Sequence, residues 1–491
     1  MRGLWLSAAL FVAAPASAAE FNHVLVIILD DVGTDKVGAY AGDVSNPTED
    51  RPQTPGLDLV AAAGVRFSDA WASPYCSPTR SMILSGGYPS RVGVGGPIGE
   101  GSEVRLGTIT DTLMKLAQDN GLRTGLFGKS HLGTTDATLA DEGQTFGLGD
   151  YPITLGFDYF AGNHHAAVDA YDDWLYTVSR PVYLTGRRYV STASNETTSP
   201  TTVTTDDAVA WMESGPPGSR RMTVVSYNLA HDTSGSTGRW DSGARSCGAK
   251  PGTDVENMKV MVECLDTAVL DLLSATPDLG DTLVIIVSDN GTADQVAEGN
   301  FNDGRGKGSV YENGVRVPLL IADGAAIGTA IRNGGGIPAR ASFRIEAGST
   351  VSDPSSVVDI FTTVADFLNL SSRTCVPGST CGKDSLSLRS VLTGGPAIRT
   401  EVWTESWTSR TTGIDGRAAI RSGDMKLVLT ARRGAECRSY QMYDLASDRW
   451  ETDDLYEDAT YTSERDELLT LLAAHEAEMN VAWIPETECG S

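Results

Sequence analysis

The sequence predicts an α/β fold in which a large, mostly parallel sheet is covered by helices and followed by a small C-terminal α+β domain. Continuous runs of Val, Ile and Leu are typical of strands buried on both faces of a parallel sheet. Helical patterns precede several of these runs, as they do in doubly wound sheets. From about residue 401 the runs become shorter, which favours antiparallel strands.

Four strand-like runs form the expected centre of the large sheet, at residues 23–29, 122–127, 222–229 and 282–287. Helical patterns lead into the second and fourth runs, over residues 112–120 and 255–275. Polar or charged residues follow each run: Asp30-Asp31, Lys129-Ser130-His131, His231-Asp232 and Asp289-Asn290. Each of these residues alone could belong to a turn, a cap or a loop. Ligands bind at the carboxyl ends of strands in such sheets, so together the residues predict a site at this edge.

The remaining segments are assigned by their composition. Lys307 lies in a glycine-flanked loop ahead of another strand, and glycine there permits close backbone approach to a ligand. Residues 191–205 and 324–352 are expected to form surface loops, because the first is rich in Thr and the second in Gly, Ala and Ser. The C-terminal part is expected to contain short strands and a terminal helix, at residues 417–420, 425–430, 440–445 and 463–479.

Charge and composition limit the classes of function. The chain has 491 residues, of which 41% are hydrophobic, enough for one large domain and a smaller one. It carries 38 basic and 64 acidic residues, so its formal net charge is −26. This acidity argues against binding of nucleic acid or anionic lipid through bulk electrostatics. An anionic substrate would need a local basic pocket.

The N-terminus predicts export. Arg2 precedes an apolar stretch over residues 4–14, and Ala16-Ser17-Ala18 offers a small-residue cleavage site, as in a secretory signal peptide. No later stretch reaches about 18 consecutive apolar residues, so we expect no membrane span and a periplasmic or secreted protein. The expected division is a signal peptide at 1–18, a large domain at 19–400 and a small α+β domain at 401–491.

The chain has seven cysteines: Cys76, Cys247, Cys264, Cys375, Cys381, Cys437 and Cys489. In an exported protein an odd count leaves at least one cysteine outside intramolecular pairing. We expect Cys76 to be that one. Cys375 and Cys381 form the most plausible local disulfide, although a free pair remains an alternative.

Cys76 lies at the N-terminus of a predicted short helix. Ser77 is expected to cap it, Pro78 suits its first position and Gly86 is expected to end it. The helix dipole and the guanidinium of Arg80 would both favour an anion near Cys76. A buried or disulfide-bonded cysteine ahead of an ordinary capped helix is the alternative.

The residue types at the sheet edge suggest a reaction class. Asp30, Asp31, Asp289 and Asn290 offer the hard oxygen ligands of Ca²⁺ or Mg²⁺. Arg80, Lys129 and Lys307 could surround a tetrahedral oxyanion and stabilise charge that develops on it. His131 and His231 are candidate general acids or bases, and His164-His165 could line the pocket. This combination indicates transfer of a sulfuryl or phosphoryl group, for which a thiolate would be a poor nucleophile.

Cys76-Ser-Pro-Thr-Arg80 with Leu84-Ser85-Gly86 resembles the C-x-P-S/T-R-x-x-x-L-T/S-G signature of the type I, formylglycine-dependent sulfatases. Further stretches agree with this resemblance: Leu29-Asp-Asp-Val-Gly33, Gly128-Lys-Ser-His-Leu-Gly133, Gly156-Phe-Asp-Tyr-Phe160, Ser288-Asp-Asn-Gly291, Gly306-Lys-Gly308, Gly314-Val-Arg-Val-Pro318 and Met442-Tyr-Asp-Leu445. Together they span nearly the whole chain after the expected signal peptide.

The resemblance implies an alkaline-phosphatase-like sandwich around a large mixed, mostly parallel sheet. It also implies hydrolysis of a sulfate ester, with an aryl sulfate as the default substrate and a sugar sulfate as another possibility. A formylglycine-generating enzyme would convert Cys76 to formylglycine, whose hydrate would supply the attacking hydroxyl. Ca²⁺, in preference to Mg²⁺, would bind the oxygen ligands named above, and Asp289 would also help to activate the hydroxyl.

The resemblance further implies roles for the basic side chains. Arg80 and Lys129 would hold the formylglycine hydrate and its sulfate ester. Lys307 and His231 would bind the sulfate and protonate the leaving alcohol. His131 would take the proton that expels sulfate and regenerates the aldehyde.

Two positions depart from the family pattern and concern the organic half of the substrate. Ser130 stands where Trp is common in G-K-W-H-L-G, and Asp232 follows His231 where Pro often comes soon after. The nearest alternative is a phosphonate monoester or phosphodiester hydrolase of the same superfamily, because the resemblance extends to such enzymes, which share the modified cysteine and the metal site and differ in pocket shape. A non-catalytic sulfate- or glycan-binding relative is the alternative from another class of protein.

Overall fold

The structure is a computed structural model that describes residues 20–43, 51–99, 104, 106–107, 111–133, 151–168, 170–183, 187–231, 247, 252–301, 303–336, 343–371, 382–407, 416–431, 437–479 and 487–489. The expected signal peptide, the expected Cys375–Cys381 disulfide and Asp232 lie outside these residues. Among the helices that the structure describes, none has the length and apolarity needed to span a bilayer.

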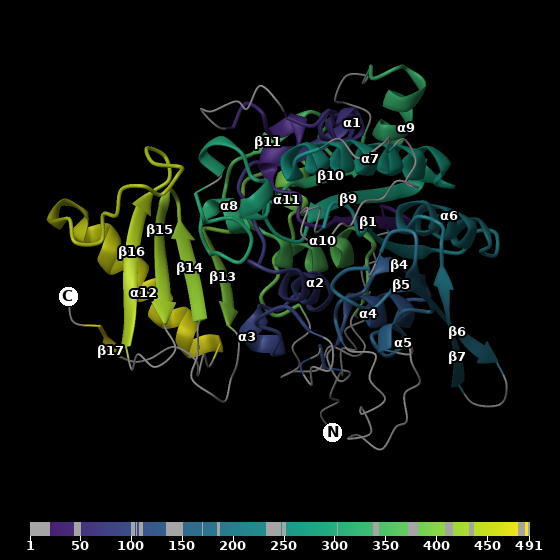
Figure 1. Ribbon diagram of the computed structural model, residues 1–491, viewed down its shortest axis with the longest axis horizontal. Helices are drawn as coiled ribbons and strands as arrows, with labels where there is room; N and C mark the ends of the chain where they lie inside the picture. Colours follow the sequence, from purple (N-terminus) through teal and green to yellow (C-terminus); the bar gives the residue numbers. More distant parts are fainter. Residues whose placement is uncertain are drawn as a thin grey trace, which may run out of the picture.

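A ten-stranded sheet in the order β11-β2-β10-β9-β1-β8-β4-β5-β6-β7 forms the centre of the fold (Figure 1). Its strands are β1 (His23–Leu29), β2 (Gly64–Phe67), β4 (Arg123–Lys129), β5 (Tyr159–Asn163), β6 (Trp174–Tyr183), β7 (Arg187–Glu196), β8 (Arg221–Ser226), β9 (Thr282–Ser288), β10 (Leu319–Asp323) and β11 (Ser349–Val351). The central strands β9, β1, β8, β4 and β5 run parallel, while β10, β6 and β7 pair antiparallel with their neighbours. The mixed, mostly parallel sheet predicted from the sequence is confirmed.

Alternate residues of β1 enter two different hydrophobic cores, which explains its continuous apolar run. Leu25, Ile27 and Leu29 pack in a core with the helices on one face of the sheet. Val24, Val26 and Ile28 pack in the core on the other face. A strand covered on both sides gains burial from every side chain, so no position along it needs to be polar.

Helices cover both faces of the sheet (Figure 1). The first core contains residues of α1 (Pro55–Ala63), α6 (Pro200–Glu213), α7 (Asp254–Ala275) and α9 (Gly324–Arg332). The second core contains residues of α2 (Cys76–Ser85), α4 (Leu113–Asp119), α10 (Ile360–Phe367) and α11 (Arg389–Leu392). Short elements complete this part of the chain: α3 (Pro89–Val92), α5 (Tyr151–Thr154), α8 (Glu312–Val315) and the paired strands β3 (Ala70–Trp71) and β12 (Ser355–Ser356).

A second, five-stranded sheet follows from Glu401 and carries a helix on one face (Figure 1). Its strands lie in chain order: β13 (Glu401–Trp407), β14 (Gly416–Ser422), β15 (Met425–Ala431), β16 (Cys437–Asp444) and β17 (Thr487–Glu488). The helix α12 (Thr462–Met479) buries Leu468 and Leu472 against the sheet. A disulfide joins Cys437 to Cys489, and a second disulfide joins Cys247 to Cys264 on α7.

Three local expectations are wrong. Residues 324–332 form the helix α9, because Asp323 accepts a hydrogen bond from Ala325 N–H at its start and Ile327 enters the core. The Thr-rich segment 191–205 contains the end of β7 and the start of α6. The cap of α2 is not Ser77, because the helix begins at Cys76 and the Ser77 hydroxyl accepts a hydrogen bond from Ile98 N–H. Gly86 ends this helix in the left-handed conformation, as expected.

Candidate active site

Two paired strands bring the acidic residues together. Leu29 at the end of β1 lies opposite Ser288 at the end of β9, so Asp30-Asp31 and Asp289-Asn290 follow at the same level. Asp289 N–H donates to Leu29 O at 3.1 Å, and Asp31 N–H donates to Asp289 Oδ1 at 3.3 Å. All four side chains are buried. The predicted convergence at the carboxyl edge is therefore present.

The donor set of this cluster fits Ca²⁺. Asn290 Nδ2 donates to Asp31 Oδ1 at 2.8 Å, while Asn290 Oδ1 is buried without a hydrogen-bond partner among the described residues. Ligand atoms of Asp30, Asp31, Cys76 and His231 lie within 4.8 Å of one another. Several carboxylates and an amide oxygen in one buried cluster are the hard ligands that Ca²⁺ prefers, and a divalent cation would offset their repulsion.

Cys76 lies at the N-terminus of α2, next to the carboxylates. Its sulfur is 3.9 Å from Asp30 Oδ1, and the residue is 2% exposed. Cys76 is a free cysteine, as expected from the odd count. Burial, together with the negative charge of Asp289, raises the pKa of the Cys76 thiol to about 12. The thiol is therefore not activated as a thiolate in this environment.

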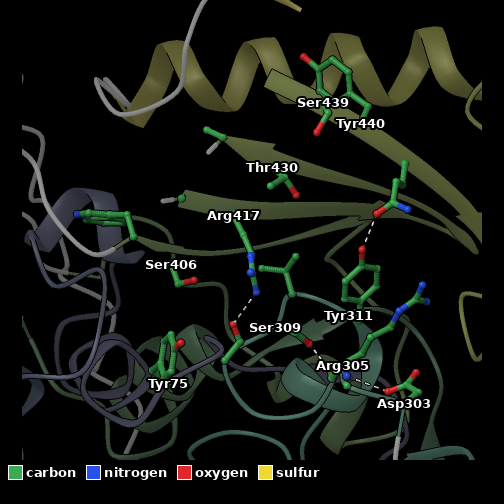
Figure 2. A pocket seen from close by; sticks show the side chains of 17 residues that line it. Tyr75, Asp303, Arg305, Ser309, Tyr311, Ser406, Arg417, Thr430, Ser439 and Tyr440 are labelled. Carbon is green, nitrogen blue, oxygen red and sulfur yellow. Dashed lines mark hydrogen bonds between the residues drawn. The ribbon is translucent and has the colours of Figure 1, made fainter. Parts of the chain in front are cut away.

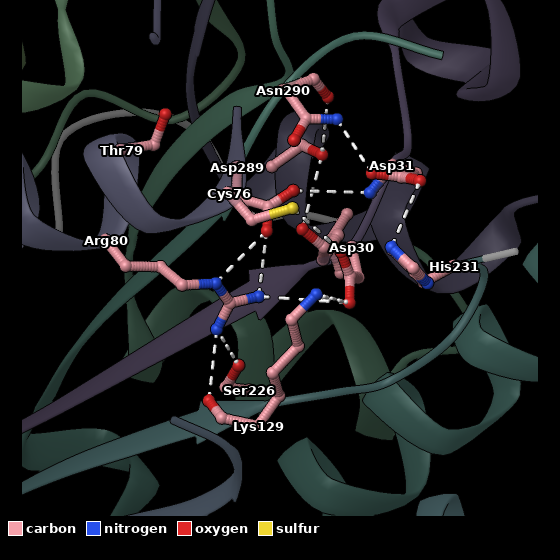
Figure 3. Close-up of polar contacts among 12 residues, drawn as sticks. Asp30, Asp31, Cys76, Thr79, Arg80, Lys129, Ser226, His231, Asp289 and Asn290 are labelled. Carbon is pink, nitrogen blue, oxygen red and sulfur yellow. Dashed lines mark hydrogen bonds and ion pairs between the residues drawn. The ribbon is translucent and has the colours of Figure 1, made fainter. Parts of the chain in front are cut away.

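Arg80 connects the strand ends (Figure 3). Its Nε and Nη2 donate to Asp289 Oδ2 at 3.1 and 2.8 Å, and its Nη1 donates to Lys129 O at 3.0 Å and to Ser226 Oγ. Burial opposes the charge of Arg80, but Asp289 and Asp30 outweigh it and raise the pKa of the guanidinium. The same ion pairing reverses the effect of burial on Asp289, because Arg80 and Lys129 lower the pKa of that carboxyl.

Two lysines pair with the remaining carboxylates. Lys129 Nζ, at the end of β4, is 2.5 Å from Asp30 Oδ2. Lys307 Nζ is 2.6 and 2.8 Å from the two oxygens of Asp31, and this pairing raises the pKa of Lys307 in spite of its burial. Burial raises the pKa of Asp30 to about 8, although Lys129 acts in the opposite direction. Additional positive charge beside Asp30 would favour its ionised form.

The histidines differ in their positions. His231 Nε2 is 3.9 Å from Asp31 Oδ2, within the cluster of Figure 3. His131 Nε2 lies 3.0 Å from Ile98 O, and among the described residues no hydrogen bond joins it to a carboxylate of the cluster. Burial, assisted by Lys129 and Arg80, lowers the pKa of His131 well below its usual value. His164 is buried against Phe160, and its carbonyl accepts a hydrogen bond from His131 N–H.

Three supporting hydroxyls were not predicted. Ser226 accepts a hydrogen bond from Arg80, Ser288 Oγ accepts one from Val32 N–H at 3.2 Å, and Thr292 Oγ1 accepts one from Gly33 N–H at 3.0 Å. Ser226 and Ser288 are the last residues of β8 and β9, so their place at the carboxyl edge was the signal that could have identified them. Ser288 and Thr292 hold the loop after β1, and Ser226 holds the guanidinium of Arg80.

Comparisons with known proteins agree with this arrangement. Arylsulfatase J of Mus musculus is 26% identical over 314 residues, which are 60% of this chain and 46% of that protein. The arylsulfatase of Klebsiella aerogenes is 36% identical over 138 residues, which are 26% of this chain and 28% of that protein. The matches thus span less than half the length of these curated relatives.

The same fold occurs in a solved structure, that of BT4656 in complex with its substrate D-Glucosamine-2-N, 6-O-disulfate. It is 18% identical and superposes with a TM-score of 0.66 over 95% of this chain and 99% of that chain. A sequence profile of the family described as Sulfatase matches residues 22–370, more than half of the chain. The chain therefore belongs to the sulfatase family.

Proposed function

We propose that the protein hydrolyses a sulfate ester, an aryl sulfate by default, at the cluster around Cys76. The observation that carries this proposal is the position of Cys76, at a helix N-terminus 3.9 Å from Asp30 and beside the paired side chains of Arg80 and Lys129. An anionic ester is attracted to such cations even though the protein carries a net charge of −26.

Asp30, Asp31, Asp289 and Asn290 would hold Ca²⁺. The buried, unpartnered Oδ1 of Asn290 and the cluster of carboxylates support this assignment. Mg²⁺ fits less well, because it demands octahedral geometry and retains water. When bound, Ca²⁺ would neutralise negative charge on the sulfate oxygens and polarise the sulfur.

Position 76 would supply the nucleophile as formylglycine hydrate, made by a formylglycine-generating enzyme. The raised pKa of the buried Cys76 thiol argues against direct attack by sulfur. Arg80 and Lys129 would orient the hydroxyl and the sulfate oxygens through their N–H groups. Asp289, held by Arg80, would help to remove the proton from the attacking hydroxyl.

The other basic residues would act on the leaving groups. Lys307 and His231 both lie beside Asp31 and would give a proton to the alcohol oxygen as the ester bond breaks. His131 would accept the proton that allows the sulfate to leave. Its lowered pKa keeps the imidazole neutral at neutral pH, as a proton acceptor requires.

Turnover of 4-nitrophenyl sulfate and of a phenylphosphonate monoester, compared on the same preparation, tests this reaction class. We expect a higher kcat/KM for the sulfate. Faster cleavage of the phosphonate would instead identify a phosphonate or phosphodiester hydrolase of this superfamily. The disulfated glucosamine bound by BT4656 makes a sugar sulfate the alternative substrate class.

We also propose that residues 1–18 are removed on export to the periplasm or outside the cell, with a catalytic domain at 19–400 and a small domain at 401–491. The disulfides Cys247–Cys264 and Cys437–Cys489 support an oxidising compartment, since such bonds are rare in the cytosol. N-terminal sequencing of the exported protein should begin after Ala18. A retained N-terminus in an exported protein would contradict the proposed cleavage.

A further inference from the structure

A cavity of about 830 Å³ lies between the loop after β9 and the second sheet (Figure 2). Tyr75 and Gly308 line one side of it, and the strands β14, β15 and β16 line the other. Pockets of about 300–1,000 Å³ enclose whole small-molecule ligands, so this cavity has room for a larger group than one aromatic ring.

The cavity adjoins the candidate active site. Tyr75 directly precedes Cys76, and Gly308 directly follows Lys307. Gly308 N–H donates to Pro74 O at 3.0 Å, and a Cβ at Gly308 would lie only 2.7 Å from the Tyr75 hydroxyl. The two segments are therefore packed together, so this end of the cavity lies beside the segments that carry Cys76 and Lys307.

Arg417 stands in the cavity wall without a carboxylate partner. It is solvent-exposed on β14, and its guanidinium makes a 3.4 Å hydrogen bond to Gly308 O. Among the described residues, no carboxylate forms an ion pair with it. Figure 2 shows Arg417 directed from the second sheet toward the loop that carries Ser309.

The other charged residues of the lining are already engaged. Arg305 donates to Glu451 O, and its guanidinium lies 4.3 Å from the centre of the Tyr311 ring. Asp303 accepts a hydrogen bond from Arg305 N–H at 2.9 Å. Arg417 is thus the lining cation that remains for a ligand, and a planar guanidinium binds sulfate and carboxylate groups through two parallel hydrogen bonds.

The uncharged lining suits a saccharide. Hydroxyl and amide groups of Ser309, Thr430, Ser439 and Gln441 can exchange hydrogen bonds with sugar hydroxyls. Aromatic side chains, among them Tyr75 and Tyr311, offer apolar ring faces between these polar groups. Mostly apolar pockets hold aromatic ligands, whereas this mixture matches a ligand that is itself polar along its length.

We propose that this cavity binds the organic half of the ester, a saccharide that bears a second anionic group, and that Arg417 binds that group. The proposal rests on the proposed hydrolysis of a sulfate ester, and it replaces the default aryl sulfate with the sugar sulfate that was the alternative substrate class. The second anion is a sulfate or a carboxylate, since both have the same oxygen geometry for a guanidinium.

Calorimetric titration of the purified full-length protein with three tetrasaccharides tests this proposal. Chondroitin sulfate carries sulfates and carboxylates, hyaluronan carries carboxylates alone, and chitotetraose in its N-acetylated form is neutral. We expect at least one anionic tetrasaccharide to bind about tenfold or more tightly than the neutral one. Binding of hyaluronan would identify a carboxylate as sufficient, and binding of chondroitin sulfate alone would identify a sulfate.

Variants of Arg417 connect the binding to this residue. Arg417→Gln should reduce the affinity for the anionic tetrasaccharide about tenfold, and Arg417→Lys should retain part of it. Arg438→Gln is the matched control, because Arg438 lies on β16 of the same sheet and pairs with Glu476 at 2.8 Å. It should bind like the wild type.

Equal affinity for charged and neutral tetrasaccharides, absence of binding to all three, or unchanged binding by Arg417→Gln would each overturn the proposal. Hydrolysis of 4-nitrophenyl sulfate by the wild type, measured in parallel, separates the two claims. Turnover without selective binding would refute the proposed second anion site and would support the proposed function. Selective binding without any hydrolysis of the sulfate ester would refute the proposed function and would support the proposed binding site.

Discussion

Arg80 donates two hydrogen bonds to one oxygen of Asp289, from Nε at 3.1 Å and from Nη2 at 2.8 Å. The same guanidinium reaches Lys129 O and Ser226 Oγ through Nη1. One side chain from α2 therefore joins the ends of β9, β4 and β8. This connection holds Asp289 beside Cys76 and fixes the relative positions of three strand ends in the candidate site.

Arg80→Ala should be destabilising as well as inactivating. Removal of one partner from a buried ion pair leaves the other charge without compensation, which costs about 3–5 kcal/mol. Urea unfolding of the variant and the wild type measures this loss. Arg80→Lys should recover part of the stability, because one ammonium cannot reproduce the forked contacts to Asp289 and Ser226. Wild-type stability in the alanine variant would show that the pair contributes nothing to folding.

Removal of Ca²⁺ should lower both activity and thermal stability. Without the ion, Asp30, Asp31 and Asp289 repel one another in a buried cluster. We expect dialysis against EGTA to lower the melting temperature and abolish turnover of 4-nitrophenyl sulfate, and Ca²⁺ to restore both more fully than Mg²⁺. A metal-free protein, verified by elemental analysis, that keeps its activity and melting temperature would exclude a structural or catalytic role for the ion.

Acid should weaken the contact between the two sheets through Asp69. Its carboxylate lies 2.7 Å from Arg421 and 2.9 Å from Arg449, and these arginines outweigh burial and lower the pKa of Asp69 to about 2. The unfolded chain has an Asp pKa of about 3.9, so the stabilisation is complete above that value and disappears as the pH falls toward about 2.

Asp69→Asn should therefore lower the free energy of unfolding by about 2 kcal/mol at pH 7, with a difference from the wild type that vanishes near pH 2. Urea titrations between those pH values measure it. Asp453→Asn, at an exposed position of the same region, is the control and should follow the wild type. A constant difference at all pH values would show that titration of Asp69 is not its cause.

Lys426 should be critical for the docking of the second sheet. Its ammonium is buried and lies 3.1 Å from Glu312 on α8 and 2.8 Å from Glu451. Lys426→Met would leave two buried carboxylates without their cation and should destabilise the protein by about 3–5 kcal/mol. Thermal and urea unfolding measure this loss. The double variant Lys426→Met with Glu312→Gln should be more stable than Lys426→Met alone, and the reverse order would refute this account of the triad.

The strand ends could be predicted because each fully buried strand has a simple signature. Residues 24–29 are apolar throughout, and the first polar residue after them is Asp30. The same rule located Lys129 and Asp289 within one sheet edge. It missed Ser226, because the predicted strand extended to Leu229, beyond the true end of β8 at Ser226. The pairing of each cation with a particular carboxylate depends on tertiary geometry, which residue spacing alone does not determine.

The two helical segments that were predicted to be loops, at the start of α6 and in α9, were missed for the same physical reason. The helix α6 begins with a run rich in Thr and α9 contains two Gly, and both residue types are less favourable in a helix than Ala. They are helical because their small side chains allow close packing on the sheet: Thr201 and Ala208 are buried on α6, and Ala326 on α9. Tertiary packing outweighed local preference at these positions. The motifs of the family resemblance, in contrast, lie at strand ends and at the start of α2, so the resemblance and the sheet topology point to the same candidate site.

Mass spectrometry of the peptide that contains Cys76, from protein produced in its native host, tests the central claim most directly. The account predicts that residue 76 of protein that hydrolyses a sulfate ester has lost its sulfur and two hydrogen atoms and gained one oxygen as the aldehyde, or has lost its sulfur and gained two oxygens as the hydrate. An unmodified thiol at Cys76 in fully active protein would contradict it.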